Sequence, residues 1–236
     1  MEPPVSPDEL ALAGPEHLDP GYVAAYERKT GFDPDEARHE LERLERYGLG
    51  PDSKLIDFGA GTGWFALAAA ARCQRIVALD VSPAMAAAIE RRAAEQHVSN
   101  VEVVQAGFLS YEHIGEPADF AYCRNALHHL PDFWKALALG RIAAVLRPGG
   151  VLLLRDIVFS FDPSEADEYI GAWVDGAAAN PTEGWTRAEL ETHLREEFST
   201  FTWLLEPMLE RAGFEIAAKD YGTRRIFAEY ECVKRG

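Results

Sequence analysis

Three glycines stand at alternate positions, Gly59, Gly61 and Gly63, directly after a short apolar run that ends at Asp57 and Phe58. Glycine lets the backbone turn sharply and lets a ligand come close to main-chain N–H groups. A helix that starts after such a turn adds unpaired N–H donors and a partial positive charge, which suit a carboxylate or a phosphate. These residues predict a cradle for a nucleotide-like ligand; the alternative is a strand-to-helix connection that merely needs glycines.

The spacing of the glycines separates the possible ligands. A dinucleotide fingerprint, Gly-x-Gly-x-x-Gly, would place its third glycine where this chain has Trp64. A phosphate-binding P-loop would need Gly-Lys-Ser/Thr, which the turn lacks. Both kinds of nucleotide site are therefore disfavoured.

A second acid, Asp80, ends the next apolar run, which begins at Arg75. The two neighbouring hydroxyls of a ribose are hydrogen-bond donors, and one carboxylate accepts from both. The alternative is that Asp80 caps the following helix, but Ser82 and Pro83 already form a good helix start. The glycine turn and this acid together favour the nucleotide-like site.

Two adjacent histidines, His128 and His129, follow another apolar run at 118–123. A histidine pair could hold a metal ion, but adjacent side chains point in different directions. No cluster of cysteine, histidine or carboxylate joins the pair in the sequence, so we expect no metal site. The structural alternative is that one histidine packs against a helix and the other is exposed.

These residues need a scaffold in which strands and helices alternate. The predicted strands lie at 54–58, 75–80, 101–104, 118–123, 151–158, 214–218 and 225–233, with the Arg147–Gly150 segment as a turn. The alternation predicts a doubly wound α/β sheet. We expect one domain over 1–236: an N-terminal tail and helices (1–48), a cofactor-binding core (49–160), a helical insert (161–205), and a last helix with edge strands (206–236).

Four motifs resemble, in order, those of the class I S-adenosylmethionine-dependent methyltransferases. They are the GAGTG turn, the acid Asp80, the segment from Asn125 to Leu130 (NALHHL), and the run LRPGGVLLLRD ending at Asp156. The third motif resembles the small-molecule group that includes the quinone methyltransferases. The resemblance covers about residues 50–158 and implies S-adenosylmethionine as cofactor. It also implies a Rossmann-like, seven-stranded, mostly parallel sheet with one antiparallel edge strand.

The resemblance assigns cofactor-binding positions, namely Asp57, Gly59, Ala60, Gly61, Gly63, Asp80, Val81, Gly107, Phe108, Asn125 and Ala126. Many relatives carry an acid after the third strand that accepts from the adenine amine. This chain has Gly107 and Phe108 there instead. Recognition of adenine would then depend on backbone groups and Phe108.

The implied reaction is an in-line displacement at a sulfonium methyl group by a nucleophile. Alignment contributes much of such catalysis, and a general base adds to it if the nucleophile carries a proton. His128 and His129 are the candidate catalytic residues. A nucleotide-dependent oxidoreductase of Rossmann type, a nucleic-acid methyltransferase and a non-catalytic S-adenosylmethionine-binding protein remain as alternatives.

The segment from Pro163 to Leu205 is longer than a crossover needs and rich in aromatic residues. Because it leaves the sheet at the cofactor's side, we expect a cap over a small, partly apolar acceptor. Trp185 and Trp203, with Tyr22 and Tyr26 of a predicted helix over 19–32, are the candidate substrate contacts. The alternative is that these aromatic residues only pack the insert onto the sheet.

Composition limits the partners. The chain has 23 basic and 39 acidic residues, a net charge of −16, which argues against nucleic acid or an anionic membrane. The acidic, proline-rich start does not resemble a secretory signal, and no apolar run is long enough for a membrane helix. Three distant cysteines without a CxxC pattern are typical of reduced, buried thiols. We expect a cytoplasmic protein, with its oligomeric state undetermined.

Overall fold

The computed structural model describes residues 6–14, Val23, 34–180 and 184–236. The predicted helix over 19–32, with the candidate substrate residues Tyr22 and Tyr26, lies outside the described residues apart from Val23.

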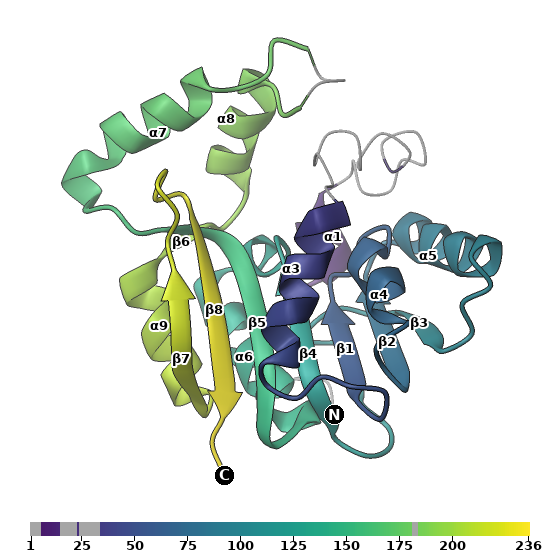
Figure 1. Ribbon diagram of the computed structural model, residues 1–236. Helices are drawn as coiled ribbons and strands as arrows, with labels where there is room; N and C mark the ends of the chain where they lie inside the picture. Colours follow the sequence, from purple (N-terminus) through teal and green to yellow (C-terminus); the bar gives the residue numbers. More distant parts are fainter. Residues whose placement is uncertain (1–5, 15–22, 24–33, 181–183) are drawn as a thin grey trace.

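One twisted sheet forms the centre of the molecule, in the order β3-β2-β1-β4-β5-β8-β7 (Figure 1). The five strands from β3 to β5 are parallel, and β8 is antiparallel to both of its neighbours. Their bounds are β1 Lys54–Phe58, β2 Arg75–Asp80, β3 Val101–Gln105, β4 Ala118–Arg124, β5 Leu146–Phe159, β7 Phe214–Asp220 and β8 Phe227–Lys234. A two-residue strand, β6 (Thr200–Phe201), pairs with β5 off this path. The doubly wound α/β fold is confirmed; the reversed strand, β8, lies one place in from the edge that β7 forms.

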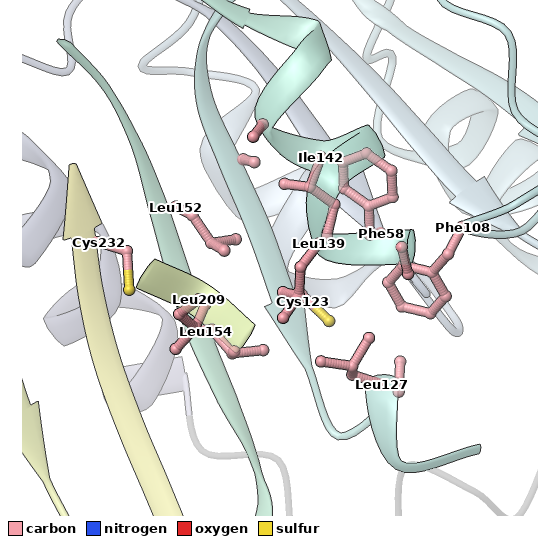
Figure 2. Packing of buried hydrophobic residues seen from close by; sticks show 14 of the residues in the cluster. Phe58, Phe108, Cys123, Leu127, Leu139, Ile142, Leu152, Leu154, Leu209 and Cys232 are labelled. Atoms are coloured by element: carbon pink, nitrogen blue, oxygen red, sulfur yellow. The ribbon is translucent and has the colours of Figure 1, made fainter. Parts of the chain in front are cut away.

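Helices cover both faces of the sheet because successive strand residues point to opposite sides. On one face, Leu55 of β1 packs with α3 (Pro34–Glu45), α4 (Trp64–Ala69) and α5 (Pro83–Glu95). On the other face, Ile56 and Phe58 pack with α6 (Asp132–Val145) and α9 (Thr202–Arg211). Figure 2 shows side chains of this second layer packed between β4, β5 and the helices. Both faces of the central strands are therefore largely apolar.

The insert lies beyond the carboxyl ends of the strands, above β5 and β8 (Figure 1). It contains η3 (Pro163–Glu165), α7 (Ala166–Asp175) and α8 (Arg187–Glu196). Thr186 and Glu189 form the capping box that starts α8, as their spacing predicts. An apolar cluster around Phe159 and Phe161 anchors the insert on the end of β5.

Two segments differ from the expectations. The Arg147–Gly150 segment lies within β5, which begins at Leu146, but pairing with β4 passes from Leu146 directly to Val151, so these four residues form an irregularity in the strand, with Gly149 at a φ of 74°. Within the segment expected as an N-terminal tail, α1 (Glu9–Ala13) forms with Asp8 as its N-cap. A docking contact of Glu9, described below, stabilises this short helix.

Candidate functional site

A pocket opens at the carboxyl ends of β1, β2 and β4, where the strand order reverses direction around β1. This is the place where ligands bind in open α/β sheets. The pocket holds about 640 Å³ of empty space, its open mouth included. Its lining comes from the glycine turn, the ends of three strands and α1: Glu9, Ala13, Gly59, Gly61, Asp80, Val81, Met85, Ala106, Gly107, Phe108, Asn125, Ala126, His129 and Leu130. We call it the main pocket.

A second, smaller pocket lies between the glycine turn, the start of α4 and the end of β4, and it contains Asp57 and Ala60. Every residue predicted for the cofactor, apart from Gly63, therefore lines one of two adjoining pockets as the described residues define them. Gly63 instead starts α4 with a φ of 80°, and a Cβ there would lie 2.9 Å from the Ile89 side chain. Its role is the close packing of α4 against α5.

Gly59 sets the distance between the turn and the end of β4. Its φ is 71°, and a Cβ at this position would lie 2.4 Å from the Ala126 Cβ. Asn125, the residue before Ala126, has a positive φ of 49°, and its Oδ1 accepts a hydrogen bond of 2.9 Å from Arg155. A non-glycine residue held in this region is uncommon, and here it lies between the two pockets.

Asp80 is fixed at the end of β2 by two backbone amides. Its Oδ2 accepts from the Gly61 amide at 2.8 Å and its Oδ1 from the Ser82 amide at 2.9 Å. Burial raises the pKa of Asp80 to about 6, although both amide bonds lower it. The Ser82 hydroxyl, not Asp80, accepts from Met85 to cap α5. The carboxylate therefore keeps acceptor capacity for a ligand in the main pocket.

Asp57 lies in β1 and lines the second pocket. Its side chain is buried, and within the described part of the chain its Oδ2 has no hydrogen-bond partner. Burial, with the negative charges of Glu40 and Asp80, raises the pKa of Asp57 well above its usual range. A buried acceptor without a partner is costly, so this position fits a ligand that brings a cation or a donor.

Glu9 is a pocket residue that the sequence did not reveal. Its carboxylate accepts from the amides of Leu109 and Ser110, at 3.1 and 3.0 Å, and from the Ser110 hydroxyl at 3.0 Å. A Cβ on Gly107 would lie 2.3 Å from a Glu9 oxygen, so a side chain there would displace this carboxylate. Many relatives carry an acid after the third strand, where this chain has Gly107 and Phe108. Glu9 thus brings an acid to this edge of the pocket from α1.

Phe108 lines the main pocket as a buried side chain. It is 8% exposed and stacks on Phe58 with ring centroids 5.7 Å apart (Figure 2).

The two histidines lie on η2 (Leu127–His129), and contrary to the expectation their rings are close, with centroids 4.4 Å apart. His129 lines the main pocket. His128 is buried behind it, where its Nδ1 forms a hydrogen bond with Asp156 and its Nε2 lies 3.0 Å from Glu197. Burial opposes a charge on this ring, but Asp156 and Glu197 outweigh it and raise the pKa of His128 to about 9.

The insert places a third histidine, His193, next to His128. His193 of α8 has its Nδ1 2.6 Å from Glu197 and its ring centre 5.1 Å from that of His128. His193 and Glu197 are four residues apart, a spacing that puts both side chains on one side of a helix. That spacing was the available signal, but nothing in the sequence connected it to His128.

The candidate substrate residues Trp185 and Trp203 lie in or beside the insert. Trp203 is 57% exposed on α9 and stacks on Phe201, and Trp185 is half-buried before α8. Neither lines either pocket as the described residues define them. Their role as substrate contacts stays a prediction.

Part of the chain matches known methyltransferases. Residues 55–150 match the family model described as a methyltransferase domain. The chain is 32% identical over 119 residues to the uncharacterised methyltransferase YcgJ of Bacillus subtilis, a match covering 50% of this chain and 46% of that protein. It is also 32% identical over 139 residues to a sarcosine/dimethylglycine N-methyltransferase of Halorhodospira halochloris, covering 57% and 47% of the two chains. The chain spans about half the length of these curated relatives.

The fold is similar to that of magnesium protoporphyrin IX methyltransferase from Synechocystis, solved with bound S-adenosylhomocysteine. The TM-score is 0.67 at 15% identity, over 96% of this chain and 100% of that one. Together these findings support a class I S-adenosylmethionine-dependent methyltransferase, with S-adenosylmethionine as the cofactor. These matches do not single out the quinone-methyltransferase group. Among the described residues, every helix is too short or too polar to span a lipid bilayer.

Proposed function

We propose that this protein transfers the methyl group of S-adenosylmethionine to a small, partly apolar acceptor. The observation that carries the proposal is the pair of carboxylates on either side of the glycine turn. Asp57 is buried with an unsatisfied oxygen, and Asp80 is held by amides with acceptor capacity left. S-adenosylmethionine offers an ammonium group to the first and two ribose hydroxyls to the second.

Chain residues hold the rest of the cofactor in this proposal. The backbone of Gly59 and Gly61 permits close approach of the ligand. Glu9 and Phe108 line the end of the main pocket that would receive the adenine ring. When bound, the cofactor supplies an electrophilic methyl group on a sulfonium.

His129 is the proposed catalytic residue. It shares the main pocket with Asn125 and Ala126, and so can contact an acceptor beside the cofactor. A positioned base contributes about 10²–10⁴-fold when the nucleophile must lose a proton. His128 does not line the pocket among the described residues; it is a positioning residue that holds η2 through Asp156.

Three observations support a small acceptor. The net charge of −16 disfavours a nucleic-acid backbone as substrate. The insert lies beyond the carboxyl ends of the strands, on the pocket's side of the sheet (Figure 1). The relatives named for sarcosine/dimethylglycine and for magnesium protoporphyrin IX act on small molecules.

The test is transfer from S-adenosylmethionine carrying a labelled methyl group, with a mixture of small metabolites as acceptors. We expect label in the small-molecule fraction, and strongly reduced transfer by an Asp80→Ala variant at low cofactor concentration. Label confined to protein or nucleic acid would contradict the proposal. A melting shift with S-adenosylhomocysteine but not with nicotinamide cofactors separates it from the oxidoreductase alternative.

A further inference from the structure

Three potential metal ligands meet where the insert touches the core. They are Nε2 of His128, Nδ1 of His193 and an oxygen of Glu197, and these atoms lie within 4.8 Å of one another. Glu197 Oε2 is 3.0 Å from His128 Nε2 and 2.6 Å from His193 Nδ1. Both histidines are buried, and the Glu197 side chain is 21% exposed. The group is therefore a closed cluster and not a solvated acidic patch.

The outer nitrogen of each ring already has a partner. His128 Nδ1 bonds to Asp156, and His193 Nε2 lies 2.8 Å from the Ser199 hydroxyl. Metal-binding histidines almost always engage a second-shell group through their other ring nitrogen, which fixes the tautomer and orients the ring. In both residues the nitrogen that remains is the one facing Glu197.

The inner atoms lie within ion-pair distance of one another. Within the described residues, Glu197 Oε2 is buried and has no hydrogen-bond partner, although two ring nitrogens lie within 3.0 Å of it. A buried acceptor left in this state calls for an explanation, and an unplaced ion is one of the common ones. A cation between the three atoms would satisfy all of them together.

We propose that His128, His193 and Glu197 bind one divalent transition-metal ion of the zinc type. Two imidazole nitrogens and one carboxylate oxygen are ligands that zinc accepts, at about 2.0–2.2 Å, with a fourth position open to water. Magnesium and calcium prefer sites made of oxygen ligands, so they fit this donor set less well. This site was not expected from the sequence, where His128 lies far from the other two ligands.

The ion would join two parts of the fold. His128 belongs to η2 of the core, next to His129 of the main pocket, whereas His193 and Glu197 belong to the end of α8 and the segment after it. The Phe198 amide already donates to the His128 carbonyl at 2.9 Å, so the two segments meet without the metal. Metal binding would fasten the insert to the wall of the methyl-transfer pocket.

The experiment uses the full chain, treated with a chelator and then titrated with zinc in a calorimeter. We expect one zinc ion per chain and a higher melting temperature with zinc. Glu197→Gln and His193→Ala should each bind at least about tenfold more weakly, whereas Glu196→Gln, an exposed neighbour, should bind like wild type. Cobalt gives a second readout, because its absorption spectrum in wild type should report nitrogen and oxygen ligands and should change in Glu197→Gln.

Equal zinc affinity in wild type and Glu197→Gln, or no binding by wild type, would overturn the proposal and leave a proton shared between His128 and its carboxylates. Circular dichroism confirms the fold of each variant, and Glu197→Gln serves if His193→Ala fails to fold. S-adenosylhomocysteine titrated into the same samples reports separately on the proposed function, so either proposal can fail alone.

Discussion

Asp80 has a pKa near the working range, so pH should control cofactor binding. Ribose hydroxyls donate to the ionised carboxylate, and protonation therefore opposes binding. Because the pKa of Asp80 is about 6 in the free protein, affinity for S-adenosylhomocysteine should fall as pH drops below that value, by at most about tenfold per pH unit. Calorimetry between about pH 5 and pH 8 checks this, and Asp80→Asn should lose the dependence. A flat wild-type profile would count against the ribose contact.

The same shift has the opposite sign for stability of the free protein. The folded-state pKa of Asp80, about 6, lies above the unfolded value of about 3.9. Its contribution to folding is therefore complete below about pH 4 and is lost as pH rises through about 6. In the ligand-free protein, Asp80 therefore contributes least to folding stability at the pH where the site binds its ligand best.

Asp57→Asn should separate stability from binding. Removing the charge of a buried carboxylate that has one unpartnered oxygen should leave the melting temperature of the free protein equal or higher. The same change removes a charged hydrogen-bond acceptor, so affinity for S-adenosylhomocysteine should fall about 10- to 150-fold. Asp52→Asn, at an exposed position, is the control for both measurements. A lower melting temperature with unchanged affinity would make Asp57 a structural residue only.

His129→Ala should reduce turnover without affecting the cofactor. We expect kcat to fall roughly 10²-fold or more, with affinity for S-adenosylhomocysteine within about threefold of wild type. The matched variant is His97→Ala, an exposed histidine at the end of α5. Steady-state kinetics with an identified acceptor provide the measurement. Unchanged kcat in His129→Ala would show that alignment alone, without this ring, accounts for the chemistry.

At the scale of elements, we expect α1 to be ordered only while Glu9 holds it against the pocket. Five residues are too few for a stable isolated helix, so its order depends on the docking of Glu9 at Leu109 and Ser110. Glu9→Ala should speed amide exchange in residues 9–13 and at 109–110, and weaken S-adenosylhomocysteine binding about three- to tenfold. Hydrogen exchange and calorimetry test this against Glu90→Ala, an exposed acid on α5. Exchange unchanged from wild type would mean that other contacts hold α1.

The elements differ in how well local sequence specifies them. The strand before the glycine turn, the Ser82-Pro83 helix start and the Thr186–Glu189 capping box were predictable because periodicity and cap chemistry act over a few residues. Docking of α1 depends on residues about a hundred positions away, and the meeting of His128 with His193 depends on how the insert folds back. Such long-range contacts leave no local pattern to read.

At the scale of the whole molecule, the sheet topology explains why distant residues share one pocket. The parallel order of β3, β2, β1, β4 and β5 brings all their carboxyl ends to one edge. Asp57, Asp80 and Asn125 were therefore predictable as neighbours once the strands were identified. The antiparallel β8 and the edge strand β7 extend the sheet beside β5. The insert and α1 lie at the edge formed by the carboxyl ends of the parallel strands (Figure 1).

The most direct test of the account is a calorimetric titration of S-adenosylhomocysteine into wild type and Asp80→Ala at neutral pH. We predict one site per chain in wild type. Loss of hydrogen bonds to a charged acceptor should weaken binding about 10- to 150-fold in the variant, with the fold intact by circular dichroism. No binding by wild type, or the same affinity in both proteins, would contradict the assignment of this pocket to S-adenosylmethionine.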